Sequence, residues 1–231
     1  MLFAKAKSNA TAAHSKSWVR TSLVAMPTPL GLRNARRDRI VHRMSLEPPI
    51  LRTARLVLRP YVLSDASQLQ ALAGAREIAD TTLNIPHPYP EGAAEAWISS
   101  YDERWRAGTF VSFAICDLVS DAVLGGMGLT IKPDHASGEL GYWVGVPFWG
   151  RGYCTEAAHA LLAYGFDGLR LQRIEASHLT RNPASGRVLH KLGMQREGVR
   201  RDAIKKWDVF EDVAISAILS PEWGALQCER L

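Results

Sequence analysis

The sequence predicts one α+β domain, built on a mixed sheet and covering about residues 45 to 225 of the 231. Strand-like and helix-like segments alternate after residue 44, as in domains whose helices cover a sheet. We find no internal repeat, which argues against a solenoid or a propeller. Apolar residues make up 47% and charged residues 22%, so fibrous and wholly disordered classes are excluded.

Seven strands and their intervening helices can be placed along the chain. Strands are expected at 55–60, 110–116, 123–131, 139–146, 174–179, 195–203 and 209–219. Helices are expected from an N-cap at Ser64 to about 73, from 94 to a stop at Gly108, from 155 to about 165 with Ala158, Leu161, Leu162 and Phe166 inward, and from 183 to 192. Three prolines between 86 and 90 exclude helix and ladder, so a loop is predicted there.

The positive charge is confined to the start of the chain. Residues 1–43 hold nine Lys/Arg and a single acid, Asp38, for a charge of +8; since the whole chain carries +5, the rest carries −3. We predict a basic, disordered extension at 1–43 and a single domain at 44–231. An organelle-targeting peptide and a nucleic-acid-binding tail are alternatives, and we favour a solvated extension, for instance one added by a start codon upstream of Met44.

Membrane and disulfide-rich classes are not expected. No segment approaches the roughly 18 consecutive apolar residues of a membrane-spanning helix. Three scattered cysteines, at 116, 154 and 228, are too few for a disulfide framework or a zinc cluster, which favours the cytoplasm and predicts no metal site. Four tryptophans, at 97, 105, 143 and 149, are expected in the core rather than in an aromatic box for a cation.

The segment most informative about function is a glycine turn between the strand at 139–146 and the following helix. Gly150 and Gly152 allow positive φ, so that consecutive backbone N–H groups can point to one place. The first turn of a helix adds unpaired N–H groups and the positive end of its dipole. Together with Arg151, this arrangement predicts a phosphate-binding turn, although its spacing matches neither a dinucleotide fingerprint nor a P-loop.

This segment resembles the pyrophosphate-binding motif of the GNAT superfamily of N-acetyltransferases, in its RimJ/RimL-type branch. The branch pattern Trp-Gly-Lys/Arg-Gly-Tyr-x-Thr-Glu-Ala matches from Trp149 to Ala157, and Cys154 stands where the wider family has Gly or Ala. The resemblance extends over nearly all of residues 50–223, including a block that begins at Asn182 and ends at Met194. It implies an α/β/α fold with a mostly antiparallel seven-stranded sheet, splayed between strands 4 and 5.

The resemblance also implies a cofactor site for acetyl-CoA, used as a co-substrate without a metal. Backbone groups of Tyr142, Trp143 and Val144 would contact the pantetheine arm and the oxyanion. Gly150, Arg151, Gly152, Tyr153, Cys154 and Thr155 would hold the pyrophosphate, and Asn182 a further part of the cofactor. Cys154 is expected to pack rather than to react.

The catalytic assignments are less direct. Many superfamily members have a general-acid tyrosine where this chain has Leu189, so Ser185 is the replacement candidate; a serine that only satisfies backbone groups is the alternative. Glu139 is the candidate general base, acting through a water, ahead of His178. The alternatives are an exposed carboxylate at a strand end for Glu139 and a structural histidine for His178. Exposed aromatic groups in the proline loop, His87 and Tyr89, are expected to shape the acceptor pocket.

The predicted activity is direct acetyl transfer to a primary amine, with the N-terminal α-amine of a protein or peptide as first candidate. A small-molecule amine, such as an aminoglycoside or a polyamine, is the second candidate, and a non-catalytic acyl-CoA-binding module the third. We expect no membrane and no nucleic-acid partner. A homodimer is compatible with the sequence, which does not determine the oligomeric state.

Overall fold

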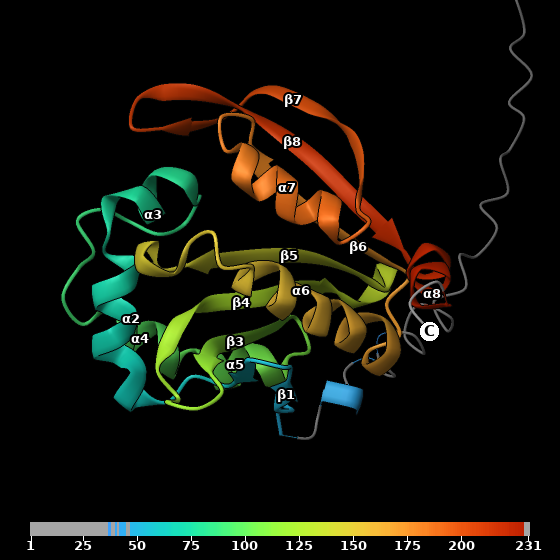
Figure 1. Ribbon diagram of the computed structural model, residues 1–231, viewed down its shortest axis with the longest axis horizontal. Helices are drawn as coiled ribbons and strands as arrows, with labels where there is room; N and C mark the ends of the chain where they lie inside the picture. The colour runs from blue at the N-terminus through green and yellow to red at the C-terminus, as the bar shows by residue number, and fades with distance from the viewer. Residues whose placement is uncertain (1–36, 38–39, 41, 45–46, 229–231) are drawn as a thin grey trace, which may run out of the picture.

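The computed structural model describes residues 37, 40, 42–44 and 47–228, and these form a mixed sheet with helices on both faces (Figure 1). The sheet has eight strands in the order β1-β2-β3-β4-β5-β6-β8-β7. Their bounds are β1 Leu51–Arg52, β2 Leu56–Arg59, β3 Phe110–Asp117, β4 Val123–Lys132, β5 Ser137–Val144, β6 Arg173–Leu179, β7 Gln195–Lys206 and β8 Val209–Leu219. The α+β class is therefore confirmed, and the strand count of seven is wrong by one because β1 pairs with β2 at the edge of the sheet.

The central feature of the sheet is the separation of β5 from β6. These strands are parallel, and their pairing runs from Ser137–Arg173 to Leu140–Ala176. Beyond that point β5 continues along β4 as far as Val144, while β6 continues along β8. The predicted splay between strands 4 and 5 is thus confirmed, and it lies between β5 and β6 in the eight-strand numbering.

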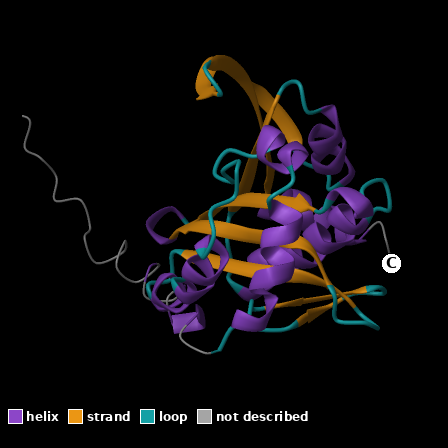
Figure 2. Ribbon diagram, turned by 90° about the vertical axis from the view of Figure 1, so that its left-hand side faces the viewer, coloured by secondary structure: helices purple, strands orange, loops and turns teal. Residues whose placement is uncertain are grey.

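Helices cover the two faces of the sheet unequally (Figures 1 and 2). Their bounds are α2 Ala66–Ala73, α3 Arg76–Thr81, α4 Ala93–Ser99, α5 Tyr101–Arg106, α6 Tyr153–Ala163, α7 Pro183–Lys191 and α8 Ser220–Cys228. Alternate residues of β3 show the division: Ala114 and Cys116 pack with α2 and α4, whereas Phe113 and Ile115 belong to the larger core under α6. All four residues predicted inward on the helix after the glycine turn are buried there.

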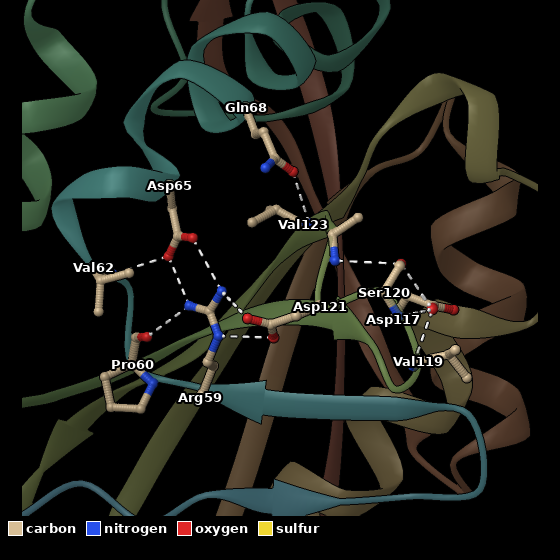
Figure 3. A network of polar contacts seen from close by, with 11 residues as sticks. Arg59, Pro60, Val62, Asp65, Gln68, Asp117, Val119, Ser120, Asp121 and Val123 are labelled. Atoms are coloured by element: carbon tan, nitrogen blue, oxygen red, sulfur yellow. Dashed lines mark hydrogen bonds and ion pairs between the residues drawn. The ribbon is translucent and has the colours of Figure 1, made fainter.

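An arginine-centred network fastens α2 to the strands beside it (Figure 3). Arg59 donates to both carboxylate oxygens of Asp65, at 2.7 and 3.0 Å, and also to Asp121 in the β3–β4 turn. Asp65 accepts the N–H of Val62 as well. The predicted N-cap role of Ser64 is wrong, because a 3₁₀ turn over Leu63–Asp65 precedes α2 and the Asp65 carboxylate takes the local backbone N–H.

The folded unit includes residues before the expected boundary at 44. Most of the predicted extension lies outside the described residues, but Arg37, Ile40 and 42–44 are helical. Ile40 and Met44 are buried in the main core, and Arg43 donates to the carbonyl of Gly168. Ile40 is therefore part of the hydrophobic core. Across the described part of the chain, no helix has both the length and the apolar character that crossing a membrane requires.

Candidate active site

The glycine turn has the backbone geometry that the sequence predicts. Gly150 and Gly152 have φ values of 75° and 80°, which side-chain-bearing residues rarely adopt. Gly152 is the N-cap of α6, and the helix begins at Tyr153, two residues earlier than expected. The first N–H groups of α6 consequently point out of the helix, at the positive end of its dipole, which suits a phosphate group.

A positive side chain that the sequence analysis did not assign to the site borders this turn. Arg55 forms a 2.6 Å ion pair with Glu156 and donates to the carbonyl of Arg151, and its guanidinium lies 4.7 Å from the centre of the Tyr153 ring. Burial disfavours the charged Glu156, but hydrogen bonds from Thr53 and Arg55 outweigh it and lower the pKa of that carboxyl. The contact spans about a hundred positions in sequence, so no local pattern indicates it.

A cavity of about 1030 Å³ follows the splay and joins the turn to the loop at 85–90. It is lined by most of the predicted site residues: Glu139, Tyr142, Trp143, Val144, Gly150, Gly152, Tyr153, Cys154, Thr155, Asn182, Ser185 and Tyr89. Arg151 and His87 do not line it. Arg151 lies over the Phe148 ring, and Nδ1 of His87 is 3.1 Å from the carbonyl of Gly74.

Two hydroxyl groups meet across the splay. The hydroxyls of Tyr142, on β5, and Ser185, on α7, are 2.6 Å apart. Burial, with a smaller contribution from Cys154, raises the pKa of Tyr142 well above its usual range, so its phenol stays protonated. Asn182 is the N-cap of α7 and accepts the Ser185 N–H at 3.2 Å, which fixes Ser185 at the mouth of the helix.

The two titratable candidates for a base differ in their surroundings. Glu139 is half-buried on β5 and accepts a 3.4 Å hydrogen bond from Ser177 of β6. His178 also lines the cavity, and its ring lies close to Gly186, where a Cβ atom would come within 2.9 Å of Nε2. Its Nδ1 atom is buried and has no hydrogen-bond partner within the described part of the chain. Burial, then the charge of Arg196, lowers the pKa of His178.

Two further predictions concern Cys154 and the tryptophans. Burial raises the pKa of the Cys154 thiol to about 12, so the thiol is protonated, in keeping with a packing role. Trp105 is buried in the larger core, and Trp97 and Trp143 pack against the smaller core beside α2 and α4. Trp149 is 48% exposed, so the core prediction is wrong for this residue. Its indole N–H instead donates to the carbonyl of Val144 at 2.6 Å and ties the glycine turn to the end of β5.

A second cavity, of about 670 Å³, lies on the outer side of the turn. It shares Gly152, Thr155 and Lys191 with the first and adds Arg52 and His159. The two cavities therefore meet at the N-terminus of α6, and Glu156 also lines the second one. Among the described residues, no group of three or more His, Cys, Asp or Glu side chains could hold a metal ion.

Comparison with known proteins identifies a family. Residues 55–195 match the model of the acetyltransferase (GNAT) domain. The chain is 32% identical over 175 residues to an uncharacterized N-acetyltransferase, p20, of Bacillus licheniformis, a match that covers 75% of this chain and 98% of that protein. It is also similar to the ribosomal protein uS5-alanine N-acetyltransferase of Escherichia coli, at 26% identity over 59% of this chain and 71% of that protein.

A solved structure shares the fold. RimJ of Mycobacterium smegmatis, determined in complex with CoA-disulfide, superposes with a TM-score of 0.66 at 23% identity, covering 75% of this chain and 87% of that protein. At this level of identity the likeness concerns the arrangement of the sheet and helices.

Proposed function

The chain belongs to the GNAT acetyltransferase family and is an N-acetyltransferase, and from that premise we propose that it transfers an acetyl group from acetyl-CoA to the N-terminal α-amine of a protein or peptide. The observation that carries the proposal is the continuous cavity, which connects the glycine turn and the Tyr142–Ser185 pair with Glu139. A donor held at one end and an amine entering at the other would meet at the splay.

The residues of the cofactor end are suited to a pyrophosphate and an extended arm. The first N–H groups of α6 and the positive-φ glycines can bind phosphate oxygens. Beyond Leu140, β5 has no described strand beside it on the β6 side. Backbone groups of Tyr142 and Val144 face this open side and suit amide groups of the pantetheine arm, whereas those of Trp143 face β4 opposite Gly126. When bound, acetyl-CoA supplies the acyl group as a thioester.

The residues at the splay can carry the proton transfers. Glu139 would accept a proton from the acceptor ammonium through a water, giving a neutral nucleophile. A backbone N–H of the Tyr142–Val144 segment would stabilise the oxyanion. Ser185 would donate a proton to the departing thiolate and take one from the phenol of Tyr142 through their 2.6 Å contact. The second proton of the amine nitrogen, released as the amide forms, would then restore the Tyr142 phenol.

Three observations bear on the acceptor and the compartment. The similar Escherichia coli enzyme acts, by its name, on an alanine of a ribosomal protein, which supports an α-amine acceptor. Glu139 is the sole acidic side chain among the described residues lining the cavity, a weak match to polycations such as aminoglycosides. The three cysteines are free, which supports a reducing compartment, and we place the reaction in the cytoplasm.

The test is an acceptor panel with purified protein and acetyl-CoA. Peptides with a free N-terminus, the same peptides with a blocked N-terminus and an internal lysine, kanamycin and spermidine are compared by release of free thiol. Mass spectrometry locates the acetyl group. The proposal expects saturable turnover on free N-termini alone. Turnover only on kanamycin or spermidine would support the small-molecule alternative, and saturable CoA binding without turnover on any amine would indicate a binding module.

A further inference from the structure

One face of β5 forms the floor of the acceptor end of the cavity. Glu139, Gly141 and Trp143 alternate along this face, while Leu140 and Val144 point to the opposite side, into the core under α6. Trp143 packs with the smaller core beside α2 and α4, which places the face on that side of the sheet. Gly141 therefore lies between the candidate base and an aromatic wall.

The protein's own packing does not require a glycine at position 141. A Cβ atom at Gly141 would meet no heavy atom within 4 Å, and the residue is exposed to the cavity. The neighbouring glycines of β4 differ. A Cβ atom at Gly128 would collide with the carbonyl oxygen of Val111, and one at Gly126 with the hydroxyl of Tyr61. Those two positions are constrained by the fold, whereas the space above Gly141 is free for a ligand.

The surroundings of this free space hold aromatic groups and the hydroxyl side chains of Ser112 and Thr130, and they carry little charge. Tyr61 and Trp97, whose rings are in edge contact at 5.0 Å, and Trp143 contribute aromatic surface to the cavity. Among the described residues, the lysine and arginine side chains that line the cavity are Arg187 and Lys191 of α7, and Lys191 also borders the second cavity beside the glycine turn. An acceptor here would place one ammonium near Glu139 and an uncharged body against the aromatic groups.

We propose that Gly141 determines acceptor specificity, because the side chain of the acceptor's first residue lies in the free space above it. This inference rests on the proposed function and names its substrate class: N-termini whose first residue is uncharged, including bulky apolar residues. Alternate Cα atoms of a strand are about 6.5–7 Å apart, which leaves room for one water on Glu139 and the first residue of a peptide over Gly141. The carboxylate of an acidic first residue would lie near Glu139 and be repelled by it. The side-chain cation of a basic first residue would have no second carboxylate among the described lining residues to pair with.

The experiment compares peptides that differ only in their first residue: Ala, Leu, Phe, Asp and Lys. Wild-type enzyme is expected to acetylate the first three with similar kcat/KM and to discriminate against the charged two. Gly141→Val fills the free space, so kcat/KM for the Leu and Phe peptides should fall about 10- to 200-fold relative to the Ala peptide. Gly141→Ala should give the same ordering with a smaller effect. CoA affinity should be unchanged in both variants.

Gly198 offers a matched control, because it is also an exposed strand glycine whose Cβ would meet nothing within 4 Å, and it does not line the cavity. Gly198→Val should leave the ratio between Leu and Ala peptides unchanged. Equal effects of Gly141→Val on the Leu and Ala peptides, or no effect on either, would overturn the inference. If Gly141→Val does not fold, as judged by lost CoA binding, the Gly141→Ala ratio decides instead. A wild-type enzyme inactive on every peptide would contradict the proposed function rather than the role of Gly141.

Discussion

Replacing Ser185 by alanine separates two roles that the hydroxyl could have. Its oxygen is 2.6 Å from the hydroxyl of Tyr142, and it lies in the first turn of α7. The cap of that helix uses the backbone N–H of Ser185, which Asn182 accepts at 3.2 Å. Because alanine keeps this N–H, Ser185→Ala removes the hydroxyl without removing the helix cap.

The two roles predict different losses of rate. If the hydroxyl only holds Tyr142, its removal costs one net hydrogen bond, about 0.5–1.5 kcal/mol, or up to about tenfold in rate. If it protonates the leaving thiolate, the loss is that of a general acid, about 10²- to 10⁴-fold in kcat. We expect the larger loss, with little change in the affinity for CoA.

The assay is thiol release from acetyl-CoA with the best peptide acceptor, at several values of pH. Ser185→Thr keeps a hydroxyl and should recover part of the rate. Tyr142→Phe should slow the reaction less than Ser185→Ala, and the double variant should be no slower than Ser185→Ala, since the two hydroxyls act in series. A Ser185→Ala enzyme within about tenfold of wild type would refute the proton-donor role and leave Ser185 as a structural residue.

Three further predictions concern other parts of the molecule. Asp65→Asn removes the charge that Arg59 binds and should lower the free energy of unfolding by about 2 kcal/mol, the size of a hydrogen bond to a charged group. Asp102→Asn, in an exposed ion pair with Arg106, should change it by less than about 0.5 kcal/mol, and urea unfolding measures both variants. Burial lowers the pKa of His178, so the unfolded state binds the proton more readily and the free energy of unfolding should fall as the pH drops below about 6.5. In His178→Asn this fall with pH should be shallower than in the wild type. Equal slopes of the free energy of unfolding against pH would contradict the prediction. Proline cannot adopt the φ of 80° that Gly152 has, so Gly152→Pro should abolish CoA binding, measured by calorimetry. The far-ultraviolet circular dichroism should stay that of the folded protein. Unchanged affinity for CoA would show that the turn is not part of the cofactor site.

The parts of the fold that could be predicted are those that local chemistry determines. Helix α7 is an example, because Asn182 caps it, Pro183 occupies its first position, and Gly193 follows it with a φ of 79°. The glycine turn is another, since positive φ at Gly150 and Gly152 follows from residue type and context. In both cases the information lies within about ten residues.

The features that the sequence analysis missed depend on distant partners. Strand β1 has two residues and forms only because β2 lies beside it. From the sequence, Arg55 is predicted only as a strand residue, because its partner Glu156 is brought next to it by the fold. Ser64 has the right residue type for an N-cap, but the Asp65 carboxylate, held by Arg59, takes the local backbone N–H instead. These outcomes depend on which distant groups the fold brings together, and local residue propensities carry no information about that.

The splay shows why the site could be located from the sequence and its chemistry could not. Four residue pairs join β5 to β6, and the remaining length of β5 is held by β4 on one side alone. Backbone groups of a strand need partners on both sides, so an open edge next to a helix N-terminus favours an extended ligand with amide and phosphate groups. One carbonyl on this segment, that of Val144, already accepts the indole of Trp149. Contacts between the ligand and the protein backbone thus follow from the topology and tolerate changes in side chains. Proton transfer depends instead on single side chains such as Ser185 and Glu139, and substituting them one at a time is what distinguishes their roles from those of neighbouring groups.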